Sequence, residues 1–156
     1  MSIQVVKFPN AQLFPEIVKL LHEGHNVKLR LGGVSMRPFL EDNRDEALLT
    51  EPVSYKVGDP ILAEVNPGHY VLHRIIRIDG DRITLRGDGN LACEYCTTDD
   101  VRACIIGFYR KGRKSMDLIT GTKWKTYSWI WTRLYPVRRY LLAFYRRIFL
   151  PLFGPV

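Results

Sequence analysis

The sequence predicts a mainly β domain, built as a folded sheet or barrel, with one N-terminal helix and a C-terminal helical extension. Between residues 27 and 109, short apolar or alternating runs are separated by turns rich in Gly, Asp, Asn and Pro, a pattern typical of short strands. From about residue 122, apolar residues recur instead at helical spacing. We therefore expect two parts, a β domain with its N-terminal helix at 1–121 and a helical tail at 122–156.

The composition is that of a globular protein with a charged end. At 156 residues, 46% of them hydrophobic and 25% charged, the chain can bury a core of its own, which argues against disorder. The net charge of +7 comes entirely from residues 122–156, which hold seven Lys and Arg and no acid, whereas 1–121 is neutral. Ten of the 18 aromatic residues, including all three tryptophans, also lie in 122–156. The basic and aromatic character therefore belongs to the tail.

The first elements expected are a strand at 3–8 and a helix at about 11–23. Asn10 is a suitable N-cap for this helix, and Gly24 is a suitable end. The helix is amphipathic and about a dozen residues long, whereas a membrane span needs roughly 20 apolar residues. We expect no membrane-spanning segment before the loop at residue 35.

Six strands are expected to follow. The Gly58-Asp59 turn opens one of them, and Asp79-Gly80 is a strong two-residue hairpin signal. The expected strands cover 27–31, 47–50, a run that ends at 65, 70–78, 82–86 and 101–109. Between the last two, Gly87-Asp-Gly-Asn90 predicts a turn.

The tail is expected to form two helices, the second at 136–150 and opened by Pro136. On the second helix four arginines fall on one arc, opposite aromatic and aliphatic side chains. Such a segment, Trp124–Phe153, can lie on an anionic membrane surface. Core packing of the aromatic stripe and a nucleic-acid patch are the alternatives, and we favour the membrane over both.

The cysteines are three in number, Cys93, Cys96 and Cys104, and the N-terminus does not resemble a secretory signal. Reduced thiols fit this count, and the location expected is cytoplasmic, peripheral at the inner face of the membrane. The pair Cys93-x-x-Cys96 supplies only half the ligands of a structural zinc site, so packing is the favoured role. We expect neither a metal nor a cofactor.

The candidate nucleophile is Ser35, in the loop Gly32-Gly-Val-Ser-Met-Arg-Pro38. A serine hydroxyl needs a base within hydrogen-bond reach to attack a carbonyl. His73, on an expected apolar strand, is the candidate base, because the pKa of imidazole lies nearest to working pH. A buried structural histidine is the alternative for His73 taken alone.

Four short segments in order resemble the sequence boxes of the signal peptidase I and LexA-like clan of serine peptidases. They are Gly33-Val-Ser-Met-Arg-Pro38, Gly58-Asp-Pro-Ile61, His73-Arg-Ile-Ile76 and Gly87-Asp-Gly-Asn90. The histidine in place of the clan's usual lysine is similar to the type found in endoplasmic-reticulum signal peptidases. The resemblance covers about residues 31–110.

The resemblance implies a serine endopeptidase that cleaves a leader or precursor peptide or protein. By it, Ser35 is the nucleophile, His73 the general base and Asp88 the candidate third catalytic residue, with Asp99 or Asp100 as alternatives. The sequence departs from the clan at Gly33, where many members have a serine that helps to bind the oxyanion, so backbone N–H groups would serve here. A soluble helix also stands where signal peptidases usually carry a membrane anchor.

A second class of function is a non-catalytic or self-cleaving regulatory module of LexA-like fold. Such a regulator is expected to carry a helix-turn-helix and an Ala-Gly or Cys-Gly cleavage dipeptide before its serine. The segment before Ser35 predicts a single helix, and residues 24–35 contain neither dipeptide. The peptidase is therefore the favoured hypothesis.

Overall fold

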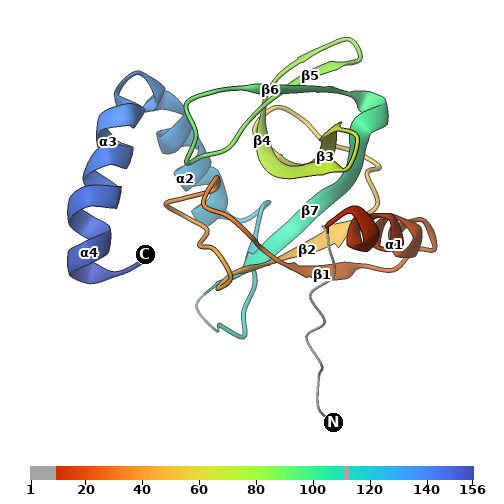
Figure 1. The fold of residues 1–156 in the computed structure, drawn as a ribbon, viewed down its shortest axis with the longest axis horizontal. Helices are drawn as coiled ribbons and strands as arrows, with labels where there is room; N and C mark the ends of the chain where they lie inside the picture. Colours follow the sequence, from red (N-terminus) through yellow and green to blue (C-terminus); the bar gives the residue numbers. More distant parts are fainter. Residues whose placement is uncertain (1–9, 111–112) are drawn as a thin grey trace.

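A computed structural model of the chain describes residues 10–110 and 113–156 (Figure 1). It is mainly an antiparallel β-sheet with helices at both ends, which confirms the expected class at this level. The N-terminal helix is α1 (Asn10–His22), and the strands are β1 (Val27–Arg30), β2 (Glu46–Thr50), β3 (Pro60–Asn66), β4 (His69–Asp79), β5 (Arg82–Arg86), β6 (Glu94–Thr97), β7 (Val101–Tyr109) and β8 (Asp117–Leu118). The expected strand at 3–8 lies outside the described residues.

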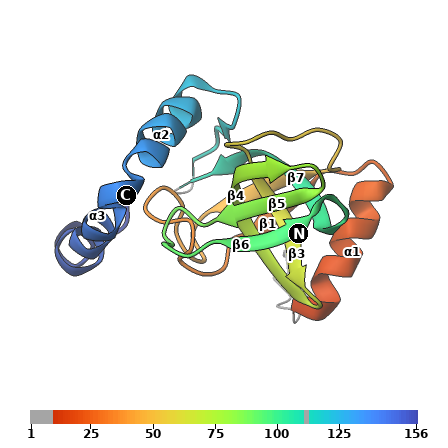
Figure 2. The same ribbon diagram turned by 90° about the horizontal axis from the view of Figure 1, so that it is seen from above.

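The described strands form one sheet of eight, with the order β1-β2-β7-β3-β4-β5-β6. The long central strand β7 pairs with β2 along one edge, and with β3 and then β8 along the other. The hairpins β3–β4 and β4–β5 turn at Gly68 and Gly80, both with positive φ, which glycine adopts without strain. Figure 2 shows the sheet curving around its own interior, with α1 on its outside.

The strand predictions and the structure agree except at two short strands. The expected bounds at 27–31, 47–50, 70–78, 82–86 and 101–109 match β1, β2, β4, β5 and β7 to within one residue. Strand β6 was not predicted, because Glu-Tyr-Cys-Thr is short and lacks an apolar alternation. The two-residue β8 carries no periodic signal at all.

Two hydrophobic clusters form the core. The first packs α1 against β1, β2 and β7 and includes Trp124, and the second lies within β3, β4, β5, β6 and β7. Trp124 is 2% exposed and comes from α2 (Thr122–Arg133), the first helix of the tail. The aromatic stripe of α2 is therefore core packing, the alternative that the sequence left open.

The second half of the tail is a broken helix. It runs through a 3₁₀ turn η2 (Tyr135–Val137), α3 (Arg138–Phe144), a π-helical turn η3 (Tyr145–Phe149) and α4 (Leu150–Phe153). Pro151 does not end this helical run. It directly follows the π-helical turn η3 as the second residue of α4, and the helix ends at Gly154, whose φ is 74°.

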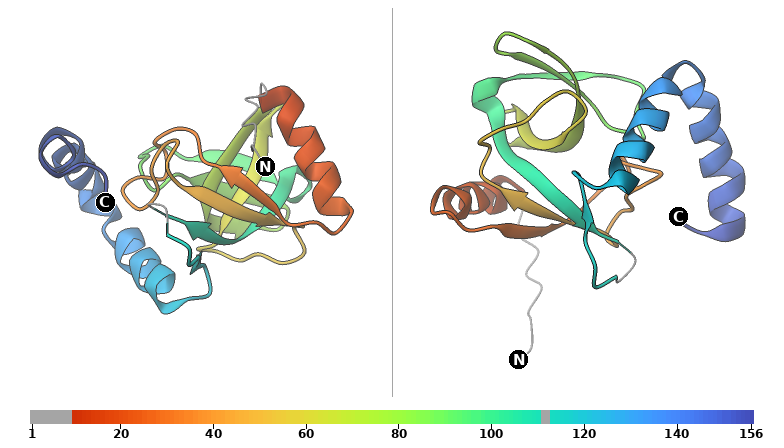
Figure 3. Two further views of the ribbon diagram at one scale, coloured as in Figure 1. Left: turned by 90° about the horizontal axis from the view of Figure 1, so that it is seen from below. Right: turned by 180° about the vertical axis from the view of Figure 1, so that it is seen from behind.

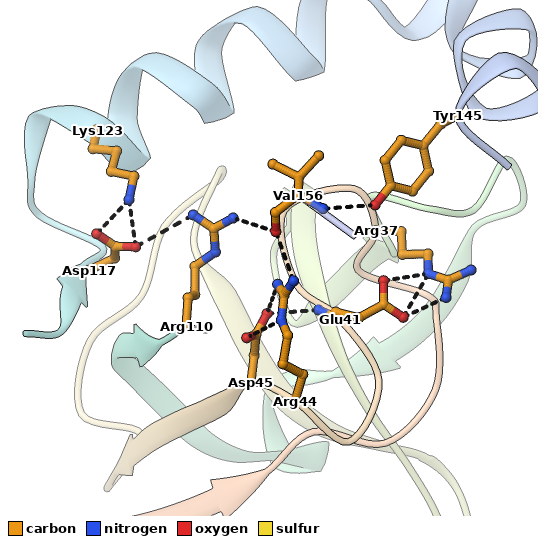
Figure 4. A network of polar contacts seen from close by, with 9 residues as sticks. All are labelled: Arg37, Glu41, Arg44, Asp45, Arg110, Asp117, Lys123, Tyr145 and Val156. Atoms are coloured by element: carbon orange, nitrogen blue, oxygen red, sulfur yellow. Dashed lines mark hydrogen bonds and ion pairs between the residues drawn. The ribbon is translucent and has the colours of Figure 1, made fainter. Parts of the chain in front are cut away.

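Polar contacts fasten the tail to the body near each of its ends (Figure 4). Near its start, Lys123 Nζ binds Asp117 at 2.8 Å, between β8 and α2. Near its end, the Val156 carbonyl accepts a hydrogen bond from Arg44 Nη1 at 2.8 Å, and within the tail the Val156 N–H donates to Tyr145 Oη at 3.4 Å. The segment between them, α3 to α4, stands beside the β body rather than on the sheet, as Figures 1 and 3 show.

Candidate active site

The Ser35 loop follows β1 and is held by its own side chains. The Gly33 N–H donates to Asp42 Oδ1 at 2.7 Å, and Gly33 has a φ of 90°, which favours glycine. Arg37 forms a two-atom ion pair with the buried Glu41 carboxylate (Figure 4). The loop that presents Ser35 is thus fixed on both sides.

The candidate base His73 is buried on β4, with only 3% of its surface exposed. It lies opposite Ile61 of β3 in the antiparallel register. Ser35 and His73 line the same cavity, of about 110 Å³, whose walls also include Met36 and Tyr70. The structure therefore brings the two predicted catalytic residues to one site.

Gly87 is the point at which the pieces of this site meet. A β-carbon at Gly87 would collide with the Ser35 carbonyl oxygen and would lie 3.0 Å from His73 Nε2 and 2.9 Å from Asn90 Nδ2. The next glycine of the turn, Gly89, donates its N–H to the same Ser35 carbonyl at 2.7 Å. The Gly87–Asn90 turn therefore packs directly on the Ser35 backbone, and His73 Nε2 borders that contact.

The carboxylate that contacts His73 belongs to Glu94, which the sequence did not single out. Glu94 Oε2 lies 2.6 Å from His73 Nδ1, which is within ion-pair distance. The N–H direction at Nδ1 departs from ideal hydrogen-bond geometry. Both atoms are buried, and neither has a hydrogen-bond partner elsewhere in residues 10–110 and 113–156. Glu94 therefore engages one ring nitrogen while the other borders the Ser35 segment.

Two opposing effects act on the pKa of His73. Burial lowers the pKa, since the charged imidazolium loses its hydration, and the Glu94 carboxylate partly restores it. Burial is the larger effect, so the pKa lies below its ordinary value. A lowered pKa keeps the ring neutral near pH 7, the form in which it can accept a proton.

Asp88, the predicted third catalytic residue, has a different set of partners. Its carboxylate accepts two hydrogen bonds from Arg74, at 2.8 and 2.7 Å, and a third from Tyr127 Oη at 2.8 Å. Asp88 and Arg74 are both almost completely buried. Trp131 Nε1 donates to the Asp88 carbonyl at 2.9 Å. The contacts of Asp88 thus join the Gly87–Asn90 turn to α2.

The two alternative acids lie just before β7, in the 3₁₀ turn η1 (Thr98–Asp100). Asp100 accepts hydrogen bonds from the Thr97 N–H at 2.7 Å and the Thr97 hydroxyl at 2.9 Å, and these bonds lower the pKa of its carboxyl group. Asp99 is exposed, and its carbonyl accepts from Arg102 at 3.0 Å. Neither side chain contacts His73 in the described structure.

Backbone donors for an oxyanion are present at Ser35 itself. The Gly33 N–H is already used by Asp42. The N–H groups of Ser35 and Met36 donate to no acceptor within residues 10–110 and 113–156. These two amides are therefore the donors that the loop offers to a charge developing beside the Ser35 hydroxyl.

Two of the three cysteines, Cys96 and Cys104, are buried thiols with a packing role. Cys96 packs in the second core cluster, and burial raises the pKa of its thiol to about 11. Cys104 is also buried, with its thiol donating to the Ser54 carbonyl at 3.4 Å. In the described part of the chain, no three His, Cys, Asp or Glu side chains gather in a way that could hold a metal ion.

Comparisons with known proteins add no family assignment. No protein-family model matches the chain, and no curated protein matches it significantly. Among the described helices, none is long and apolar enough to cross a lipid bilayer.

Proposed function

We propose that the protein is a serine endopeptidase in which Ser35 is the nucleophile, His73 the general base and Glu94 the residue that orients His73. The observation that carries the proposal is the position of the His73 ring. Its Nδ1 pairs with Glu94 at 2.6 Å, and its Nε2 borders the Ser35 segment at Gly87. A base held by a carboxylate on one nitrogen and facing a serine with the other is the arrangement that activates serine for acyl transfer.

The reaction then follows from the roles of these groups. Nε2 of His73 takes the Ser35 proton as the hydroxyl oxygen attacks a peptide carbonyl, and the Ser35 and Met36 N–H groups stabilise the oxyanion. The protonated ring returns that proton to the leaving amine. Water, activated by the same ring, hydrolyses the acyl-enzyme and restores Ser35. The substrate class proposed is a leader or precursor peptide or protein.

The fold proposed is the signal-peptidase and LexA-like one, on the basis of the four sequence segments in order. Three features support it: the serine loop after β1, the histidine on β4 and the Gly87–Asn90 turn on the serine backbone. Glu94 rather than Asp88 takes the third role in this proposal, because Asp88 is fully engaged by Arg74 and Tyr127.

A fluorophosphonate probe, which labels activated serines, tests the proposal. Wild type and the control Ser115→Ala, which removes an exposed serine far along the chain, are expected to be labelled equally. Ser35→Ala is expected to lose all labelling. His73→Gln is expected to be labelled at least 100-fold more slowly, because general-base catalysis contributes at least that factor. Equal labelling of Ser35→Ala and wild type would reject Ser35. Absence of labelling, with cleavage of the chain at one internal bond during incubation, would favour the self-cleaving module.

We further propose that the enzyme works at an anionic membrane surface, peripheral at the cytoplasmic face, through α3 to α4 rather than the whole tail. This segment exposes large apolar side chains: Tyr140 is 61% exposed, Phe144 54%, Ile148 47%, Leu152 69% and Phe153 73%. Arg139 and Arg147 are exposed beside them, and residues 122–156 contain no acid. Apolar side chains bordered by arginine favour the interface of an anionic bilayer.

A further inference from the structure

A second cleft shares no lining residue with the Ser35 cavity and has the Arg74–Asp88 pair in its wall. Its walls come from the β4–β5 hairpin and from the end of α2 through the start of α3, and its volume is about 480 Å³. That size suits a small-molecule site. Four arginines line it, Arg74, Arg77, Arg86 and Arg138, whereas Asp88 is its one acid among the described residues.

The charge in this cleft is not balanced by the protein. Asp88 is already bonded to Arg74 through two atoms. Arg77, at the mouth, pairs with the exposed Asp79 at 2.6 Å. Arg86 and Arg138 have no carboxylate partner within residues 10–110 and 113–156. The inner part of the cleft therefore carries an excess of two positive charges.

Arg138 is the more unusual of these two cations, because it is 4% exposed. One of its N–H groups donates to the Trp131 carbonyl at 2.8 Å, and its guanidinium lies over the rings of Trp131 and Tyr135, at 5.2 and 5.4 Å. Its Nε is buried and has no acceptor among the described residues. Burial lowers its pKa, the Asp88 charge opposes that shift in part, and the like charge of Arg86 adds to it. A buried guanidinium with unused donors is costly unless an anion meets it.

Arg86 presents the same feature from the opposite wall. Its guanidinium lies 3.7 Å from the centre of the Tyr135 ring, and its Nε is buried without an acceptor in the described structure. Tyr135 thus lies against both arginines, and both line the cleft. Two planar guanidinium groups with free N–H donors match the geometry of a tetrahedral oxyanion.

We propose that this cleft is a binding site for a phosphate group, held between Arg86 and Arg138 with Tyr95 and Tyr135 as its aromatic walls. The phosphate can belong to a soluble phosphomonoester or to a lipid headgroup such as phosphatidate, since both present the same dianion. The site is separate from the proposed catalytic residues, and its occupancy does not depend on peptidase activity.

Calorimetric titration of the full-length protein with inorganic phosphate tests the site. At constant ionic strength, saturable binding is expected for wild type, with a melting temperature that rises with phosphate. Arg138→Gln and Arg86→Gln are each expected to weaken binding at least tenfold. Arg82→Gln, an exposed arginine of β5 outside the cleft, is the matched control and should bind as wild type does. If Arg138→Gln fails to fold because Arg138 is buried, the result for Arg86→Gln decides the test.

A second arm distinguishes the two sources of phosphate. Vesicles with phosphatidate are compared with vesicles of equal charge made with phosphatidylglycerol, which lacks the monoester. Loss of binding by Arg86→Gln on phosphatidate vesicles alone identifies the lipid headgroup. An effect confined to dissolved phosphate identifies a soluble ligand. Binding that chloride reproduces at the same concentration, or that both variants retain unchanged, would overturn the proposal.

Discussion

His73 and Glu94 lie on β4 and β6, two strands apart across β5, and their side chains meet with Nδ1 and Oε2 2.6 Å apart. Glu94 is opposite Leu85 in the β5–β6 register, and Leu85 is opposite Ile75 in the β4–β5 register. The contact thus depends on the pairing of three strands. It fixes which nitrogen of His73 faces the serine loop.

Replacing Glu94 by Gln should therefore slow catalysis without unfolding the protein. The expected loss in kcat is about 10²- to 10⁴-fold, because the ring is no longer oriented or its charge stabilised in the transition state. The acid limb of the rate profile should also move to lower pH, since the carboxylate raises the His73 pKa and the variant lacks it. Steady-state kinetics on a peptide substrate across pH 4 to about 8 measures both effects.

Glu46→Gln is the matched control for this variant. Glu46 is also a strand carboxylate paired with a cation, Lys28 at 3.4 Å, but it lies on β2 and does not line the Ser35 cavity. It should leave kcat within about twofold. Unchanged kinetics in Glu94→Gln would show that the Glu94 contact is structural and not part of the reaction.

The stability of the protein should fall as acid protonates His73. The folded pKa lies below the ordinary value of about 6.5, so below that pH the unfolded chain binds more protons than the native one. Unfolding free energy from urea titrations is expected to decrease as pH falls through 6.5, until the folded pKa is reached. His73→Gln should remove that part of the pH dependence. A steeper loss in the variant than in wild type would contradict the assignment.

Gly87→Ala should damage the site more than the fold. The added β-carbon meets the Ser35 carbonyl and lies 3.0 Å from His73 Nε2, so either the turn or the base must shift. Overpacking of this kind costs about 1–3 kcal/mol of stability. A displaced base should lower kcat at least tenfold, measured per folded molecule. Gly32→Ala is the control, because a β-carbon there meets nothing within 4 Å. Equal activity of the two variants would refute the close packing on Ser35.

Asp88→Asn should lower stability rather than act directly on the reaction. It removes the charge that partners the buried Arg74, and breaking a buried ion pair costs about 3–5 kcal/mol. The urea midpoint should drop, while kcat per folded molecule stays within a few fold. Asp79→Asn, which breaks the exposed pair with Arg77, should cost less than about 1 kcal/mol. A stable Asp88→Asn variant with lost turnover would return Asp88 to the catalytic group.

The sequence predicted the local features of the site well. Ser35 lies in a loop and His73 on an apolar strand because glycine spacing and apolar periodicity are local signals. The Gly87–Asn90 turn was found for the same reason. Strand bounds at β5 and β7 were correct, since Asp79-Gly80 and the long run at 101–109 mark them clearly.

Residue pairing across the fold was beyond local reasoning. Glu94 lies in a strand without a periodic signal, and its partner is 21 positions away through β5. Asp88 lies in the predicted turn, but only the folded structure shows that its buried partner is Arg74. Helical spacing in the tail showed which residues share a face, but spacing does not reveal which face meets the body. Trp124 packs in the core, whereas Phe144 is exposed.

The division of the tail gives the last prediction, which concerns membrane binding. Deleting residues from 122 onward would also remove Trp124 from the core, so point variants on α3 to α4 are the sharper test. Phe144→Ser combined with Phe153→Ser should lower binding to vesicles containing phosphatidylglycerol at least tenfold, because both side chains are more than half exposed and apolar. Arg147→Gln should lower vesicle binding about fivefold, because one cation near an anionic surface contributes about 1 kcal/mol. The effect of this variant should be smaller at high salt.

Val53→Ser, which removes an apolar side chain 83% exposed on the body, is the control and should change nothing. Co-sedimentation measures all three. Binding that ignores lipid charge and salt, or that Val53→Ser reduces as much as the double variant does, would reject α3 to α4 as the membrane-facing surface.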